Sequence, residues 1–134
     1  MSTTPQRGFP DTEFAARCAA AQAVMARRDI NAMLFASEAE IRYFTGFLTP
    51  FWQSPTRPWF LVLPLTGRPV AVIPTIGVPL MSQCYVDDVV SWASPAKQDD
   101  GVSLLAGAIR KIIGGTGTLG LLMGRETAMR MPLA

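Results

Sequence analysis

The chain has 134 residues, of which 49% are hydrophobic and 16% are charged, and its formal net charge at neutral pH is +2. These values are typical of one globular domain and exclude a disordered chain. The basic residues are scattered and the apolar runs are short, which argues against a nucleic-acid-binding face and against a membrane span. No signal-peptide pattern opens the chain, so we expect a cytoplasmic protein whose residues 1–10 form a flexible N-terminus.

The first predicted element is an amphipathic helix between Asp11 and Asp29. Asp11 is a residue type that commonly caps the start of a helix. Apolar side chains then recur at steps of three and four, the spacing that places them on one helix face. These residues are Phe14, Cys18, Ala21 and Met25.

A buried strand and a short second helix are expected next. Residues 32–37 form a continuous apolar run, as in a strand covered on both faces. Ser37 and Glu40 have the spacing of a capping box, in which each side chain bonds the other residue's backbone N–H. Gly46 can end this helix because glycine readily adopts the left-handed backbone conformation.

A β-hairpin follows an aromatic, proline-containing loop. Its two apolar runs, residues 59–65 and 70–73, are separated by a short turn that contains Gly67. Pro64 and Pro69 cannot donate a backbone hydrogen bond, so they should lie at strand ends.

The rest of the chain continues to alternate helix and strand. The predicted elements are a weak helix over residues 77–84, a strand over 89–92, a helix with an apolar stripe from Leu104 to Ile113, a strand over 119–123 and a helix from Arg125 onward. Such alternation with one hairpin predicts an α/β fold of three layers, with a mixed five- or six-stranded sheet between helices.

Catalytic chemistry has few candidates in this sequence. The chain has no histidine, which removes the Ser-His-Asp arrangement and the commonest zinc ligand. Cys18 and Cys84 fit buried small hydrophobes rather than a disulfide framework. The pairs Asp87-Asp88 and Asp99-Asp100 fit turns and caps. We therefore expect no catalytic and no metal-binding residue in this chain.

The glycines of "GTGTLG", residues 115–120, have the letters of a dinucleotide-binding fingerprint. That fingerprint requires a preceding strand and a following helix, so that the helix N-terminus receives the pyrophosphate. Here a predicted helix precedes the glycines and a predicted strand follows them. A helix end followed by a flexible turn is therefore the better interpretation, and a nucleotide titration would test it.

The aromatic loop offers the candidate binding residues. Phe51 and Trp52 lie between Pro50 and Pro55, where the backbone cannot pair regularly. Burying such a loop would leave its polar backbone groups without partners, which is costly. We therefore expect both side chains at the surface or in an interface, with Arg57 nearby.

Three segments resemble the N-terminal domain of the creatinase/prolidase family, which includes Xaa-Pro dipeptidases and aminopeptidases. They are "RDINAMLFASEAEIRYFTGF" (28–47), "RPWFLVLPLTGRPVAVIP" (57–74) and "GRETAMRMP" (124–132). The resemblance covers residues 11–134 and implies a ribonuclease H-like domain that precedes a catalytic domain absent from this chain. It also implies that the catalytic domain holds two divalent metal ions (Mn, Co or Zn).

The resemblance implies a role for the aromatic loop too. In this family the N-terminal domain packs against a catalytic domain, commonly that of a neighbouring subunit, and helps to wall the substrate pocket. Arg57 corresponds in position to an arginine that meets the substrate carboxylate in creatinase-like members. Phe51, Trp52 and Arg57 are thus candidate substrate or interface contacts, and a solvated loop arginine is the alternative for Arg57.

Several functions remain open at this stage. The leading one is the non-catalytic domain of a homodimeric dimetal hydrolase that acts on Xaa-Pro peptides or a small creatine-like amide. Some family members have lyase or ectoine-hydrolase chemistry, so the substrate class remains open. A different class of function is a stand-alone binding module. The chain stops early in a predicted helix, which favours a longer parent protein, and the reading frame beyond Ala134 would discriminate between the two classes.

Overall fold

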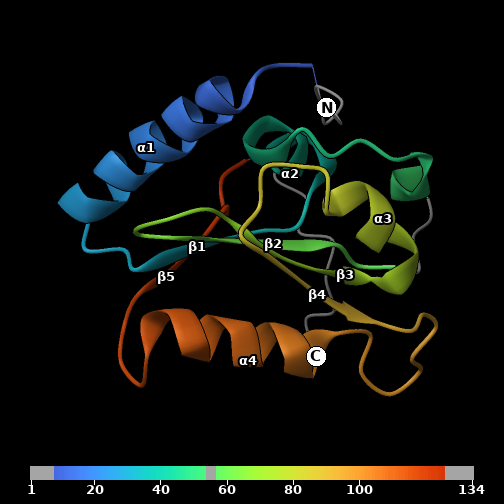
Figure 1. Cartoon of the computed structure of the whole chain (residues 1–134). Coiled ribbons are helices and arrows are strands. Elements are labelled where there is room, and N and C mark those ends of the chain that lie inside the picture. The colour runs from blue at the N-terminus through green and yellow to red at the C-terminus, as the bar shows by residue number, and fades with distance from the viewer. Residues whose placement is uncertain (1–7, 54–56, 126–134) are drawn as a thin grey trace.

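The computed structural model describes residues 8–53 and 57–125, and it shows a layered α/β domain (Figure 1). The elements follow one another largely as the sequence patterns predict. In chain order they are α1 (Asp11–Arg27), β1 (Ala32–Phe35), α2 (Glu38–Thr45), the 3₁₀ turn η1 (Pro50–Gln53), β2 (Phe60–Pro64), β3 (Val70–Pro74), the 3₁₀ turn η2 (Thr75–Gly77), α3 (Val78–Met81), β4 (Asp88–Trp92), α4 (Val102–Ile113) and β5 (Leu119–Leu121).

The five strands form one mixed sheet in the order β4-β3-β2-β1-β5. The hairpin is antiparallel, and β2 also runs antiparallel to β1. The two outer strands are parallel to their neighbours, with β4 beside β3 and β5 beside β1. This confirms the predicted hairpin and the mixed sheet.

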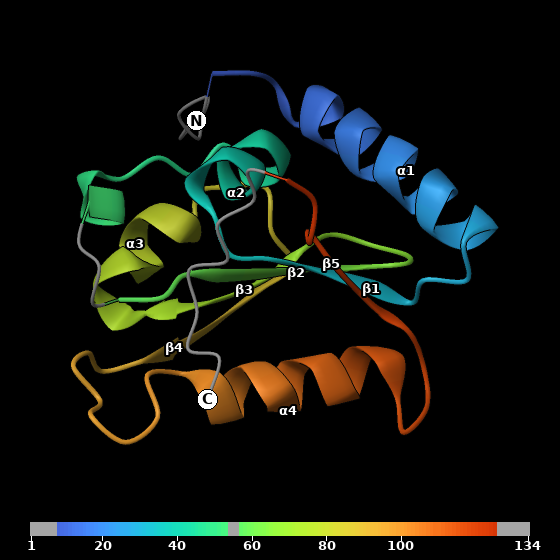
Figure 2. The ribbon, with the colours of Figure 1, turned by 180° about the vertical axis from the view of Figure 1, so that it is seen from behind.

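Helices cover both faces of the sheet. Figures 1 and 2 show α1, α2 and α3 on one face and α4 on the other. Strand β2 is buried on both faces because alternate side chains of a strand point in opposite directions. Leu61 and Leu63 belong to the core under α1, α2 and α3. Phe60 and Val62 belong to the core under α4.

The helix ends differ in part from the predicted caps. Helix α1 begins at Asp11 itself, and Pro10 rather than Asp11 occupies the cap position. Ser37 is the N-cap of α2 as predicted, but its side chain makes no capping hydrogen bond, so the capping box with Glu40 is not formed. Gly46 ends α2 in the left-handed conformation with φ 79°, as predicted.

The ends of the chain are described only in part. Phe9 packs edge-on against Phe14 of α1, with ring centroids 6.3 Å apart. Residues 1–7 of the predicted flexible N-terminus lie outside the described residues. Most of the helix predicted from Arg125 onward, residues 126–134, lies outside them as well. In the described part of the chain, no helix combines the length and the apolar character that a bilayer crossing requires.

Replacing Leu61 by alanine should destabilise the domain by about 2–5 kcal/mol, because Leu61 is fully buried in the central strand and truncation leaves a cavity. Leu48, which is 49% exposed, provides the matched control, since Leu48→Ala should change stability by no more than about 0.5 kcal/mol. Urea unfolding followed by circular dichroism measures both changes. Equal effects of the two substitutions would contradict the assigned core.

Candidate functional site

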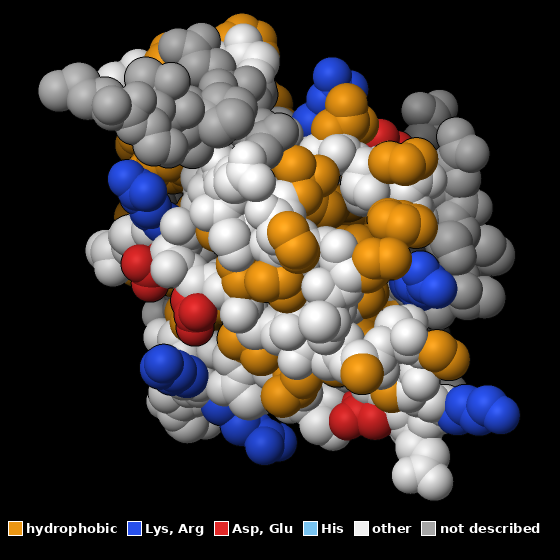
Figure 3. Space-filling model, turned by 45° about the vertical axis from the view of Figure 1, so that its right-hand side comes forward, with side chains coloured by type: hydrophobic (Ala, Val, Ile, Leu, Met, Phe, Trp, Pro, Cys, Tyr) orange, Lys and Arg blue, Asp and Glu red, His pale blue; other side chains and the backbone are white. Residues whose placement is uncertain are grey.

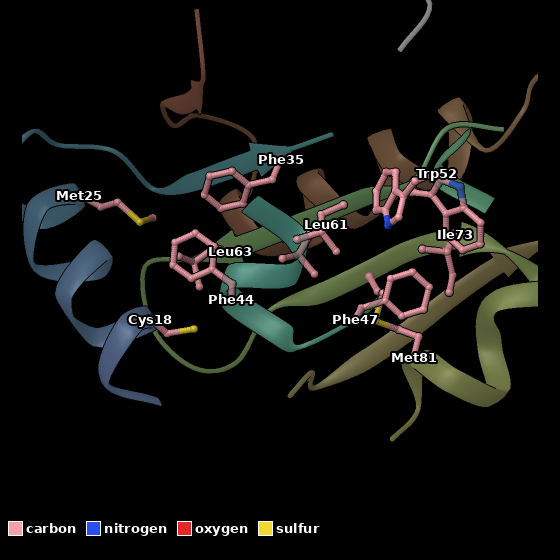
Figure 4. Close-up of a cluster of buried hydrophobic side chains, with 13 residues drawn as sticks. Cys18, Met25, Phe35, Phe44, Phe47, Trp52, Leu61, Leu63, Ile73 and Met81 are labelled. Atoms are coloured by element: carbon pink, nitrogen blue, oxygen red, sulfur yellow. The ribbon is translucent and has the colours of Figure 1, made fainter. Parts of the chain in front are cut away.

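The aromatic loop connects α2 to β2 and includes η1. Trp52 is 4% exposed and lies within the core, so the expectation that its side chain is at the surface is wrong. Its ring centroid is 5.8 Å from that of Trp59, which in turn is 5.4 Å from that of Phe47. Figure 4 shows Trp52 in the same cluster as Ile73 and Met81. Trp52 therefore anchors the loop to its own domain.

Two buried threonines explain how this loop can be buried. Thr45 and Thr49 are at most 7% exposed. The Thr45 Oγ1 hydroxyl accepts a hydrogen bond from the Phe47 backbone N–H at 3.1 Å. Thr49 Oγ1 accepts one from the Phe51 N–H at 3.3 Å. These hydroxyls give buried backbone groups the partners that the sequence argument had assumed to be missing.

Phe51 points in a different direction from its neighbour. A 3₁₀ turn has three residues per turn, so adjacent side chains diverge by about a third of a circle. Phe51 is 36% exposed, while Trp52 is buried. The loop thus turns one aromatic inward and leaves the other partly at the surface.

Arg57 meets Phe51 at this surface. Its Cζ atom lies 5.7 Å from the centre of the Phe51 ring, within cation–π range. Arg57 is half-buried, and residues 54–56, which connect it to η1, lie outside the described residues. The structure therefore brings Phe51 and Arg57 together, as expected, and places Trp52 behind them in the core. A guanidinium in this position offers a planar, two-pronged donor to a carboxylate.

Further exposed hydrophobic side chains accompany this pair. Leu48 precedes η1 and is 49% exposed, and Ile76 of η2 is 52% exposed. Figure 3 shows hydrophobic side chains gathered on the face that carries η1 and α3. The sequence argument did not single out Leu48 or Ile76, because an isolated aliphatic residue in a loop carries no pattern that predicts exposure.

Trp59 holds the base of the site in place. It is 1% exposed, and its ring lies against the backbone of Gly77. A Cβ atom at Gly77 would collide with this ring. The sequence alone did not assign this requirement to Gly77, which is distant in the chain.

The other titratable groups do not form a reactive centre in the described part of the chain. Burial raises the pKa of the Cys18 thiol to about 11, so this thiol is protonated at neutral pH. Hydrogen bonds from the side chain and the backbone of Ser103 lower the pKa of Asp99, which lies just before α4. Within the described ranges, no group of three or more cysteine, aspartate and glutamate residues could hold a metal ion.

The acidic pair and the glycine run behave as structural features. Asp87 and Asp88 are exposed at the start of β4, where Asp88 Oδ1 accepts a hydrogen bond from the Val89 N–H at 2.8 Å. Gly114 ends α4, and residues 115–118 connect that helix to β5. The glycines precede a strand rather than a helix, as the sequence indicated, so they lack the helix N-terminus of a phosphate site.

The layered α/β fold can be compared with known protein families. Residues 17–128 match the model of the creatinase/prolidase N-terminal domain. The chain belongs to this family. A comparison with curated proteins finds no match.

Solved structures support the same fold. A prolidase from Thermococcus sibiricus is similar with a TM-score of 0.69 and 19% identity, over 86% of this chain and 29% of that one. Dipeptidase PepE from Mycobacterium ulcerans has a TM-score of 0.58 and 26% identity, over 75% and 27% of the two chains. The creatinase/prolidase N-terminal domain of an X-Pro dipeptidase from Streptococcus pyogenes has a TM-score of 0.54 and 17% identity, over 80% and 99%. This chain thus spans less than a third of the prolidase.

Replacing Trp52 by alanine should cost about 3–5 kcal/mol of unfolding free energy, because its ring fills the core beside Trp59. The adjacent Phe51→Ala should change stability by about 0.5 kcal/mol or less, since its side chain is partly exposed. Thermal and urea unfolding compare the two variants. A stable Trp52→Ala protein would contradict the anchoring role.

Proposed function

We propose that this chain is the non-catalytic N-terminal domain of a hydrolase that acts on Xaa-Pro peptides or on a small creatine-like substrate. The observation that carries the proposal is the family match over residues 17–128. Similar domains occupy 29% of a prolidase and 27% of a dipeptidase, so each of those proteins has a further, larger part. The proposed parent protein has a catalytic domain of the same kind.

Any metal pair of this hydrolase belongs to that catalytic domain. The chain has no histidine, and the described residues contain no cluster able to bind a divalent ion. The described residues therefore do not fit two metal ions, and no chemical step is assigned to them. The role of this domain is to position and to enclose the substrate.

The surface around η1 is the part proposed to face the substrate and the catalytic domain. Trp52 fixes η1 to the core, and Phe51 supports the Arg57 guanidinium at 5.7 Å. Leu48 and Ile76 supply exposed apolar area, and hydrophobic side chains gather on the face that carries η1 and α3 (Figure 3). An interface with the catalytic domain of a second subunit would bury this area, and a homodimer in the cytoplasm is the assembly we propose.

In this arrangement Arg57 binds the substrate carboxylate, and the apolar surroundings strengthen that interaction by excluding water. A hydrogen-bonded ion pair gains strength in such a low-dielectric environment. A stand-alone binding module that uses the η1 surface without a catalytic partner is the second candidate. A reading frame that ends at Ala134 would support the stand-alone module.

The 134-residue chain alone should hydrolyse neither Xaa-Pro dipeptides nor creatine, with or without manganese, cobalt or zinc. The physical reason is that the chain has no histidine and that its described residues offer no metal site. Proline release and creatine consumption measure the activity. Turnover that persists through repurification would show that the accessory assignment is wrong.

In the full-length parent, Arg57→Ala should raise KM for a carboxylate-bearing substrate about 10- to 100-fold, the effect of losing a hydrogen bond to a charged group. Arg57→Lys should recover part of this loss, because lysine keeps the charge but not the two-pronged geometry. Steady-state kinetics with the substrate and with its C-terminal amide separate the contributions.

Arg27→Ala, which removes an exposed arginine from the end of α1, is the matched control and should leave KM unchanged. The amide substrate should respond little to any of the Arg57 changes. An equal loss for the acid and the amide, or an early melting transition of Arg57→Ala, would contradict carboxylate binding by Arg57.

A further inference from the structure

A groove of about 600 Å³ lies on the opposite face of the sheet from the Trp52 cluster. It runs beside α4, with Val70 of β3 and Val90 of β4 among its lining residues. The turn of the hairpin, including Thr66 and Arg68, closes one end. This region will be called the α4 groove. Its volume lies in the range of small-molecule sites, about 300–1,000 Å³.

The α4 groove exists because one helix covers one face of a five-stranded sheet. Helix α4 packs mainly on β1, β2 and β3, and the edge strand β4 lies beyond it (Figure 1). Leu104 of α4 is consequently 39% exposed although it is a large apolar residue. The described residues thus leave part of the apolar surface between α4 and β4 uncovered.

Gly107 of α4 lines the α4 groove and, because it has no side chain, occupies little of its space. A Cβ atom at this position would meet no atom within 4 Å, so packing within the described residues does not require glycine there. Glycine in the middle of a helix is less favourable than alanine. A helix that carries glycine beside a cavity thus leaves room for a ligand at some cost to its own stability.

The rim of the α4 groove carries charges of both signs. Arg68 and Lys111 are basic, and Asp87 and Asp88 are acidic. The Arg68 guanidinium lies over the ring of Tyr85, with Cζ 4.5 Å from the ring centre, and Tyr85 packs against the core on the opposite face of the sheet. Within the described part of the chain, none of these four charges forms an ion pair, since the single salt bridge joins Arg17 and Glu13. Lys111, Asp87 and Asp88 are therefore available to a ligand, whereas the Arg68 guanidinium is already stacked on Tyr85.

We propose that the α4 groove binds a small zwitterion with an apolar body, of the size of a dipeptide. Its carboxylate meets Lys111, its ammonium group meets Asp87 and Asp88, and its apolar part lies on the valine and leucine side chains of the groove. Charge complementarity and the apolar floor together select this class. A purely apolar ligand would leave the charges unused, and an anion would meet the two carboxylates.

The test uses the 134-residue chain and the dipeptide leucyl-leucine as the probe, followed by ¹H–¹⁵N correlation spectra. Saturable shifts should appear at the amides of Gly67 and Gly107, which border the α4 groove. Acetylation of the amine or amidation of the carboxylate removes one charge of the probe. Each modification should weaken binding about threefold to tenfold, the effect of a partly exposed ion pair or a charged hydrogen bond.

Two variants locate the ligand. Gly107→Leu fills the open space and should abolish the shifts while the protein remains folded. Lys111→Gln should weaken the binding of leucyl-leucine but not that of its C-terminal amide, because only the free dipeptide has the carboxylate. Arg110→Gln removes a neighbouring exposed charge of α4 outside the groove and should change nothing.

Three results would overturn the proposal: no saturable shift, equal affinity of the free and the doubly blocked dipeptide, or shifts confined to Phe51 and Arg57. The last result would place the ligand at the η1 surface and would leave the proposed function intact. Conversely, binding at the α4 groove is independent of whether Arg57 contacts a substrate, since the two regions lie on opposite faces of the sheet.

Discussion

The burial of β2 on both of its faces is the constraint on which the rest of this domain depends. Leu61 and Leu63 require a cover on one side of the sheet, and Phe60 and Val62 require one on the other. Helices α1 and α2 with α3 supply the first cover, and α4 supplies the second (Figure 2). In the sheet β1 and β3 flank β2, so its backbone is also paired on both edges.

The aromatic loop is shaped by where β2 begins. Trp59 immediately precedes this strand and is held between Trp52, Phe47 and the backbone of Gly77. With its indole fixed there, η1 is tied to the core, and the partly exposed Phe51 is directed outward beside Arg57. Trp52, which anchors the turn, and Phe51, which lies at the candidate binding surface, are thus adjacent residues of η1. Their side chains point in different directions, so one contributes to stability and the other is available for contacts.

The two faces of the sheet offer different surfaces to other molecules. The face with three helices carries the loop, whose exposed residues in the described part, Leu48, Pro50 and Phe51, are apolar and lie near the half-buried Arg57. The face with α4 alone is incompletely covered and has a groove with charges of both signs. A large apolar surface suits contact with another domain, whereas a charged, concave one suits a small polar molecule. This contrast follows from the number of helices on each face.

The sequence by itself determined the order of the elements, the hairpin and the mixed sheet, because these depend on local periodicity and on turn residues such as Gly46 and Gly67. The family followed from the resemblance of three segments to known members. The sequence also determined the lack of a histidine-based active site. Only the tertiary structure decided that Trp52 is buried, since this depends on the hydroxyls of Thr45 and Thr49 and on space beside Trp59. The tertiary structure also decided that Ser37 makes no capping hydrogen bond and that a groove lies beside α4. Contacts between residues distant in the chain set these features, and no local pattern records which partner a side chain will find.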